Sequence, residues 1–172
     1  LYNDENNGLE IFESLLSIQH RGQDGAGIYN LSDNTIDGIK KKGLINNLCS
    51  YEGLKSMKSK IYLGHTRYKT NNVPNSFQPF HLRNENFNMI FCHNGNIINT
   101  TEIAIILEQE FDVQLDDSYS DSYLLFNLIF HYINLNFFQK IDSTLIVKLS
   151  NFLHDNIPVS YTHLRAHETA YH

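Results

Sequence analysis

The residues best suited to chemistry lie in the segment 91–96, which reads Phe-Cys-His-Asn-Gly-Asn. A short apolar run precedes it, and a helical pattern begins near Thr100. Asn-Gly is a strong turn signal because both residues tolerate a positive φ, so the segment alone is typical of a hairpin. A strand, a tight turn and a helix would instead expose backbone N–H groups and the Asn94 amide, which together can stabilise an oxyanion. The segment by itself leaves both interpretations open.

Composition restricts the class of protein. With 172 residues, the chain is long enough for one domain with a hydrophobic core and short for two. Its 41% hydrophobic and 19% charged residues are typical of a globular domain, and its net charge of -6 argues against a broad nucleic-acid-binding face. No apolar run approaches the ~18 residues of a membrane span. Two cysteines, Cys49 and Cys92, are too few for a disulfide framework. We therefore expect a cytoplasmic protein that binds neither nucleic acid nor membrane.

The two ends of the sequence differ from its middle. The chain starts at Leu1, inside a stretch that already reads as structured. From Val159 to Thr169 its residues match a sequencing-library adapter translated in one frame, and such foreign segments are excluded from fold reasoning. We expect a fragment of one domain over residues 1–157 and a non-native tail over residues 158–172.

The body of the chain predicts alternating helices and strands. We expect helices over 9–19, weakly over 45–57, from Thr100, from Ser118 and over 141–153, and strands over 26–31, 35–41, 61–68 and 87–92. The glycine-rich loop 19–27 leaves a helix and enters a strand. Phosphate-binding loops leave a strand and open a helix, so the context excludes phosphate binding. Asn99–Glu102 has the form of a capping box, and the spacing of Cys49 suggests core filler.

Some polar residues have simple structural interpretations. Asp121 falls in the first turn of a predicted helix, where a carboxylate complements the helix dipole. His20, His65, His81 and His93 lie on separate segments without the helical spacing of zinc ligands, so no metal site is expected.

Five short motifs nevertheless occur in a recognisable order. They are Gln-His-Arg-Gly-Gln-Asp-Gly-Ala-Gly (19–27), Gly-His-Thr-Arg-Tyr (64–68), Gln-Pro-Phe (78–80), His-Asn-Gly-Asn (93–96) and Ser-Asp-Ser (120–122). The set resembles the class II glutamine amidotransferases, and among them the glutaminase domain of the amidophosphoribosyltransferases, over nearly the whole chain up to the tail. The related enzymes that make glucosamine 6-phosphate usually have Tyr-Arg-Gly, Arg-Trp and His-Asn-Gly-Ile at the corresponding places.

This resemblance implies an α+β fold of the Ntn-hydrolase type, in which two antiparallel sheets lie between helical layers. It implies that an N-terminal cysteine attacks the side-chain amide of glutamine, with its own α-amino group carrying the proton. Asn94 and Gly95 match the oxyanion hole, Arg67 the arginine that binds the α-carboxylate, and Asp121 the carboxylate that binds the α-amino group. Thr70 corresponds to a threonine of the glutamine pocket. Arg21 corresponds to a supporting arginine near the nucleophile.

The sequence departs from the family at the nucleophile. A Cys-Gly segment would begin the mature family chain shortly before the equivalent of Leu1, and neither Cys49 nor Cys92 matches it. We therefore expect this polypeptide to lack glutaminase activity as it stands.

The resemblance also implies partners outside the sequence. They are L-glutamine, a missing C-terminal phosphoribosyltransferase domain that uses PRPP to form 5-phosphoribosylamine in purine synthesis, and further copies in a homo-oligomeric parent. No cofactor is expected in this domain, and Mg²⁺ only in the missing one. Two alternatives stay open: the glutaminase domain of another class II enzyme, making glucosamine 6-phosphate or asparagine, and a non-catalytic glutamine-binding module.

Overall fold

The computed structural model describes residues 2–32, 35–68, 76–115, 119–137 and 140–157. The predicted tail, residues 158–172, lies outside them. The elements in chain order are β1 (Tyr2–Asn7), α1 (Gly8–Ser17), η1 (Gln19–Arg21), β2 (Gly25–Ser32), β3 (Thr35–Lys42), η2 (Ile45–Asn47), α2 (Tyr51–Ser56), β4 (Lys58–Arg67), β5 (Phe80–Arg83), β6 (Asn88–Phe91), α3 (Thr100–Phe111), α4 (Asp121–Leu135) and α5 (Ser143–Asn156). None of the helices in these ranges is long and apolar enough to cross a bilayer.

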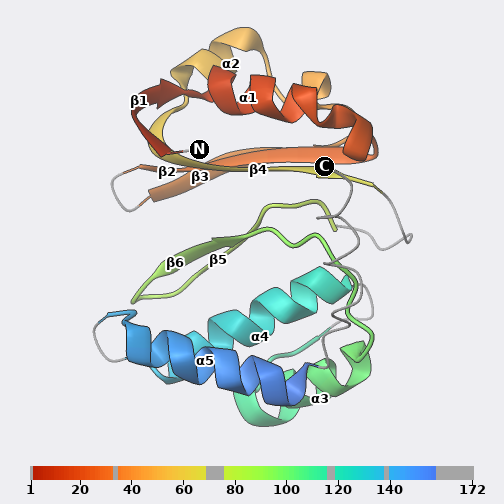
Figure 1. Ribbon diagram of the computed structural model, residues 1–172, viewed down its shortest axis with the longest axis vertical. Helices are drawn as coiled ribbons and strands as arrows, with labels where there is room; N and C mark the ends of the chain where they lie inside the picture. Colours follow the sequence, from red (N-terminus) through yellow and green to blue (C-terminus); the bar gives the residue numbers. More distant parts are fainter. Residues whose placement is uncertain (1, 33–34, 69–75, 116–118, 138–139, 158–172) are drawn as a thin grey trace, which may run out of the picture.

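The elements form four layers (Figure 1). Helices α1 and α2 cover one face of a four-stranded antiparallel sheet with the order β1-β4-β2-β3. Its other face looks toward the two-stranded antiparallel sheet β5-β6, and helices α3, α4 and α5 lie on the far side of that pair. This arrangement confirms the expected α+β fold of two antiparallel sheets between helical layers.

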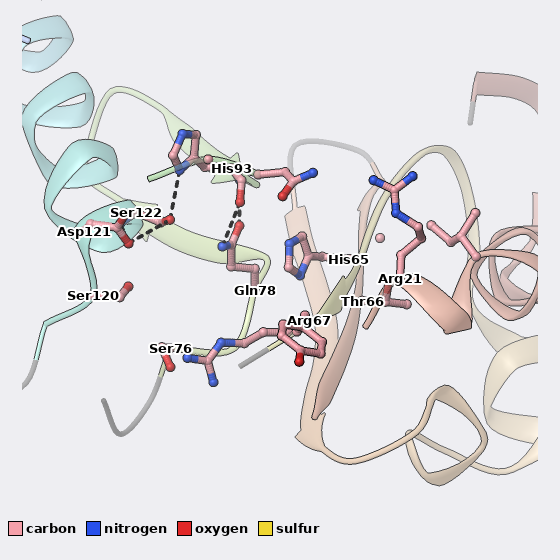
Figure 2. A pocket seen from close by; sticks show the side chains of 15 residues that line it. Arg21, His65, Thr66, Arg67, Ser76, Gln78, His93, Ser120, Asp121 and Ser122 are labelled. Carbon is pink, nitrogen blue, oxygen red and sulfur yellow. Dashed lines mark hydrogen bonds between the residues drawn. The ribbon is translucent and has the colours of Figure 1, made fainter. Parts of the chain in front are cut away.

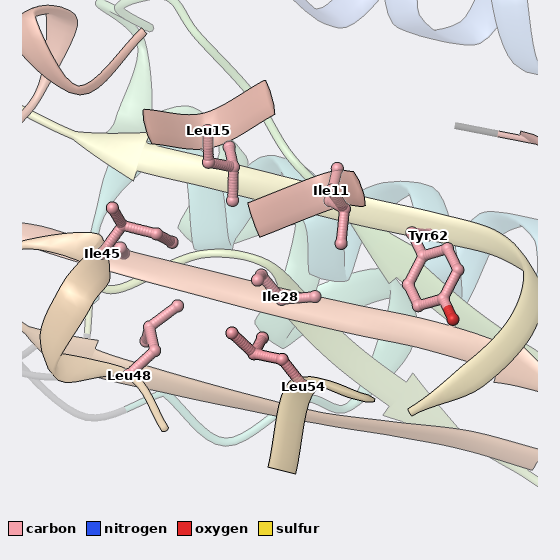
Figure 3. Packing of buried hydrophobic residues seen from close by; sticks show 8 residues of the cluster. Ile11, Leu15, Ile28, Ile45, Leu48, Leu54 and Tyr62 are labelled. Carbon is pink, nitrogen blue, oxygen red and sulfur yellow. The ribbon is translucent and has the colours of Figure 1, made fainter. Parts of the chain in front are cut away.

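The upper core lies between α1, α2 and the larger sheet (Figure 3). It is an aliphatic cluster centred on Ile28, which is fully buried and packs with Ile11, Leu15 and Leu54. Burying a side chain of this kind stabilises the fold by ~1.5–3 kcal/mol, so the cluster firmly fixes α1 on the sheet. Cys49 packs against the same cluster, which confirms its predicted role as core filler.

The lower core is largely aromatic where the smaller sheet meets α4. Phe126 of α4 is fully buried, with ring-centroid distances of 6.1 Å to Phe80 of β5 and 5.3 Å to Phe91 of β6. A second aliphatic group, including Ile103, Leu107 and Leu128, joins α3 to α4. The strand that ends at Phe91 is therefore held by its side chains against the start of α4.

Pairing in the larger sheet brings the glycine-rich loop beside the end of β4. Gly25 pairs with Arg67, and the backbone N–H of Asp24 donates to the Arg67 carbonyl at 3.0 Å. A Cβ on Gly22 would fall 2.5 Å from the Arg67 backbone, and one on Gly27 would collide with the carbonyl oxygen of Gln78. These two glycines therefore allow close backbone approach, and their role explains the loop composition without a phosphate ligand.

Local signals predicted most of the elements, but they missed strands β1 and β5, and two further predictions need correction. The pattern over 45–57 is broken into η2 and the short helix α2. Helix α3 begins at Thr100 as expected, but Asn99 makes no capping hydrogen bond with its side chain. Its Nδ2 instead donates to the carbonyl of Asn156 at 2.7 Å, so a tertiary contact replaces the predicted capping box.

Candidate active site

A cavity of about 530 Å³ opens between the two halves of the molecule. Four segments line it: the end of β4, the residues before β5, the residues after β6 and the start of α4, with Arg21 of η1 beside them. Figure 2 shows Arg67 and His65 on one side of the cavity and Asp121 and Ser122 on the other. Its volume falls within the range of small-molecule sites.

Arg67 supplies the positive charge on the β4 side. It is the last residue of β4, and its Cζ lies 5.6 Å from the centre of the Phe77 ring, a cation–π contact. Burial lowers the pKa of its guanidinium, while the charges of Asp24 and Asp121 oppose that shift. An arginine remains charged at neutral pH, so the cavity carries a fixed cation with a planar fork of donors.

Asp121 supplies the negative charge on the opposite side. It opens α4, which Ser120 caps by accepting a hydrogen bond from the Tyr123 N–H at 3.2 Å. One carboxylate oxygen accepts from the Ser122 N–H at 2.7 Å, and the other accepts from the Ile97 N–H at 3.0 Å. The carboxylate therefore does more than complement the helix dipole, because it also ties α4 to the segment that follows β6.

Asn94 and Gly95 follow β6 and are exposed to the cavity. The chain continues from them into α3 without a returning strand, and Gly43 alone among the described glycines has a positive φ. The hairpin interpretation of Asn-Gly is therefore wrong. Asn94 and Gly95 instead lie at a strand end with an amide and backbone N–H groups available for a developing negative charge.

His93, which immediately precedes Asn94 and Gly95, is held in place by hydrogen bonds. Its backbone N–H donates to Gln78 Oε1 at 2.6 Å and its carbonyl accepts from Gln78 Nε2 at 3.1 Å. Its Nδ1 lies 2.9 Å from the Ser122 hydroxyl, so His93 is joined to both neighbouring segments (Figure 2). Burial lowers the pKa of the imidazole, and the Asp121 charge acts in the opposite direction.

The structure brings together nearly all the residues singled out from the sequence. Arg21, Arg67, Asn94, Gly95 and Asp121 line the same cavity, although they come from four separate motifs. The remaining candidate, at position 70, lies outside the described residues.

Sequence reasoning did not assign a role to three further residues of the cavity: His65, Gln78 and Ser122. A signal existed for His65, because residues two apart on a strand share a face and Arg67 follows it at that spacing. Burial, aided by the charge of Arg67, lowers the pKa of His65 to about 4, so its imidazole is neutral at pH 7. Gln78 and Ser122 belong to two of the five motifs, but no role was assigned to them because both act through partners distant in sequence.

Neither cysteine is suited to act as a nucleophile. Burial raises the pKa of Cys92 to about 12 despite the nearby charge of Lys40, and burial also raises the pKa of Cys49. Both thiols are therefore protonated at neutral pH, and the thiolate is the reactive form. Among the residues that the structure describes, no group of three His, Cys, Asp or Glu side chains is arranged to hold a metal.

Arg67 and Asp121 lie on opposite sides of this polar cavity, and Asn94 and Gly95 line it as well. That pattern is complementary to a zwitterionic amino acid whose side chain reaches the donors. It does not suit a polyanion, because Asp121 would repel one.

Comparisons with known proteins agree with this geometry. The amidophosphoribosyltransferase of Schizosaccharomyces pombe is 34% identical over 122 residues, which cover 69% of this chain and 22% of that protein. That of Methanothermobacter thermautotrophicus is 36% identical over 104 residues, covering 59% and 22%. No protein-family model matches the chain.

Solved structures give the same result. The glutamine PRPP amidotransferase of Bacillus subtilis, complexed with ADP and GMP, superposes with a TM-score of 0.67 at 28% identity, covering 89% of this chain and 31% of that one. A structure described as the allosteric regulatory enzyme of purine biosynthesis gives a TM-score of 0.66 at 29% identity. The chain thus spans about a fifth of the length of the curated relatives it matches.

The four-layer fold and these similarities place the chain in the class II glutamine amidotransferases, with an Ntn-type fold. Within that class its homologues are the amidophosphoribosyltransferases, and it corresponds to their glutaminase domain.

Proposed function

We propose that the cavity binds L-glutamine and releases its side-chain amide as ammonia, for the formation of 5-phosphoribosylamine from PRPP in a longer parent protein. The observation that carries this proposal is the convergence of Arg67, Asp121 and Asn94 on one cavity from three separate motifs. Arg67 pairs with the α-carboxylate of the substrate and Asp121 with its α-ammonium group. These two contacts leave the side-chain amide of the substrate directed toward Asn94 and Gly95.

The reaction follows from that orientation. A thiolate attacks the amide carbon, and the carbonyl oxygen becomes an oxyanion that the Asn94 side chain and the Gly95 N–H stabilise. The carbon–nitrogen bond breaks as the leaving group takes a proton from the terminal α-ammonium group, which releases ammonia. Water then attacks the thioester, yielding glutamate and restoring the thiol.

We assign the nucleophile to a cysteine upstream of Leu1, and the larger sheet supports that placement. Among the described residues, β1 pairs with Lys58, Ser59 and Ile61 of β4, and β2 pairs with Ile61 to Arg67 along the opposite edge of β4. Tyr2 pairs with Ile61, and Arg67 lies six residues further along β4. An antiparallel strand continuing upstream of Tyr2 would therefore reach the cavity about six positions before Tyr2.

The test is a series of extended chains. Each carries about four to ten extra residues before Leu1 and begins with a cysteine whose α-amino group is exposed by protease cleavage. We expect release of glutamate, measured by a coupled dehydrogenase assay, to peak at one length of the series. Matched chains that begin with serine, or with glycine before the cysteine, separate the thiol from the α-amino group and should both be inactive.

The 172-residue chain without an extension allows binding to be measured separately from turnover. It should bind L-glutamine in calorimetric titration without hydrolysing it, because neither thiol it contains is ionised. Absence of binding, together with absence of turnover at every length, would overturn the proposed function. Binding without turnover at every length would favour a non-catalytic glutamine-binding module.

A further inference from the structure

Gln78 occupies an unusual place at the end of the smaller sheet. Phe80, the first residue of β5, pairs with Phe91, the last residue of β6; Gln78 lies two residues before that pair and His93 two residues after it. Residue 79 is a proline, which has no N–H to offer a strand partner. The Gln78 side chain instead makes two hydrogen bonds with the His93 backbone: its Oε1 accepts from the His93 N–H at 2.6 Å and its Nε2 donates to the His93 carbonyl at 3.1 Å.

The position of this amide is itself fixed from the other sheet. Gln78 is only 6% exposed, and its carbonyl oxygen and the Pro79 ring lie directly against Gly27 of β2, where any added Cβ would collide with them. A buried amide that uses both its donor and its acceptor has a strong geometric preference, since each bond lost leaves an unsatisfied polar group. The larger sheet therefore fixes the position of the Gln78 amide, and that amide fixes the position of the His93 backbone.

His93 is followed immediately by the two proposed oxyanion donors, Asn94 and Gly95. Both are exposed, and the backbone before them is what the Gln78 amide holds. We propose that Gln78 is a positioning residue for the reaction: it aligns the Asn94 side chain and the Gly95 N–H with the developing oxyanion by bonding the His93 backbone. This inference rests on the proposed glutaminase function.

The first variant is Gln78→Met, which keeps the length of the side chain and removes both hydrogen bonds. In the active extended chain, kcat should fall by about 10- to 100-fold, because a misplacement of about 1 Å at the reacting centre has effects of that size. KM should change by less than about three-fold, since Arg67 and Asp121 still hold the substrate and make uniform binding contacts. A raised KM with unchanged kcat would show that Gln78 is a binding contact and would overturn the inference.

Gln19→Met is the matched control. The Gln19 amide also uses both its acceptor and its donor: it accepts from the Ile45 N–H at 2.7 Å and donates to the Gly22 carbonyl. Gln19 does not line the cavity. Both variants should lower Tm, whereas Gln78→Met alone should lower kcat. Equal loss of kcat in both variants would indicate a general structural effect and would contradict positioning.

If Gln78→Met folds poorly, Gln78→Glu provides a second test of the same two hydrogen bonds. A carboxylate accepts from the His93 N–H but cannot donate to the His93 carbonyl, whereas a protonated carboxyl does both. Burial raises the pKa of such a group, so the ratio of variant to unsubstituted kcat should rise as pH is lowered from about 8 to about 6. A ratio that does not change with pH would argue against a role for the two hydrogen bonds between the residue 78 side chain and the His93 backbone.

A measurement on the 172-residue chain needs no nucleophile. In Gln78→Met, the His93 amide should exchange with deuterium about ten-fold faster or more, while the Phe91 amide keeps its protection. Unchanged exchange at His93 would overturn the inference. The two proposals fail differently: an inactive cysteine-extended chain without substitutions argues against the glutaminase function, whereas an active one with an unaffected Gln78→Met variant argues against Gln78 alone.

Discussion

The Asp121 carboxylate accepts a hydrogen bond from the backbone N–H of Ile97, with 3.0 Å between Oδ2 and nitrogen. Ile97 lies two residues after Gly95, so this bond links the proposed substrate anchor to the segment that carries the proposed oxyanion donors. Ser122 adds a second link through His93 Nδ1 at 2.9 Å. The start of α4 and the end of β6 therefore act as one unit on that side of the cavity.

Replacing Asp121 by asparagine should weaken glutamine binding by about ten- to a hundred-fold, because a charged hydrogen bond to the α-ammonium group is lost. Calorimetric titration of L-glutamine into the 172-residue chain measures this. Asp142→Asn is the matched control: Asp142 caps α5 by accepting from the Leu145 N–H at 2.9 Å, and asparagine caps equally well. Similar affinities for the two variants would remove Asp121 from the binding site.

Arg67→Lys tests the shape of the cation separately from its charge. Lysine keeps the charge but lacks the planar fork that matches a carboxylate, so the Kd for L-glutamine should rise by about ten-fold. Arg83→Lys makes the same change at the exposed end of β5, outside the cavity, and should leave the Kd unaltered. A normal Kd in Arg67→Lys would contradict a bidentate contact.

Asn94→Ala should lower kcat in the cysteine-extended chain by about 10²–10³-fold, which is the usual effect of removing one oxyanion donor. Substrate affinity should change little, because the ground-state amide is not yet charged. Asn96→Ala, an exposed neighbour that does not line the cavity, serves as the control. Equal rates in the two variants would show that the Asn94 amide does not face the developing charge.

His65 should make stability depend on pH. Its pKa of about 4 lies below the ordinary value of 6.5, so between these values the unfolded chain binds the additional proton. Its contribution is therefore complete above about pH 6.5 and is lost as pH falls toward about 4. After allowance for partial solvent screening, the loss is on the order of 2 kcal/mol.

His65→Gln should flatten the decline of the unfolding free energy between pH 6.5 and pH 4, measured by urea denaturation. His154→Gln removes an exposed histidine of α5 and provides the comparison. His93 also has a lowered pKa, so some slope should persist in the His65 variant. An unchanged slope would mean that His65 is protonated as readily in the folded chain as in the unfolded one.

Sequence predicted the features that depend on neighbouring residues. The hairpin of β2 and β3 follows from turn residues and alternation, and the helix expected from Ser118 follows from apolar spacing, although it begins at Asp121. The cavity was anticipated only through the resemblance, because nothing local places Arg67 opposite Asp121. The misassigned capping box has the same origin: the partner of Asn99 lies 57 residues away, and a tertiary bond competed successfully with the local one. Gln78 was overlooked because its amide completes a strand pair that only the folded sheet defines.

The anchors for the ligand belong to different layers: Arg67 ends a strand of the sheet under α1 and α2, and Asp121 opens a helix on the far side of the other sheet. We expect an amino acid bound between these two proposed anchors to hold the two halves of the molecule together. A ligand present at about a hundred times its Kd adds about 2.7 kcal/mol to the free energy of unfolding. The rise in melting temperature caused by each ligand therefore reports its affinity, so glutamine, glutamate and asparagine can be compared without any turnover.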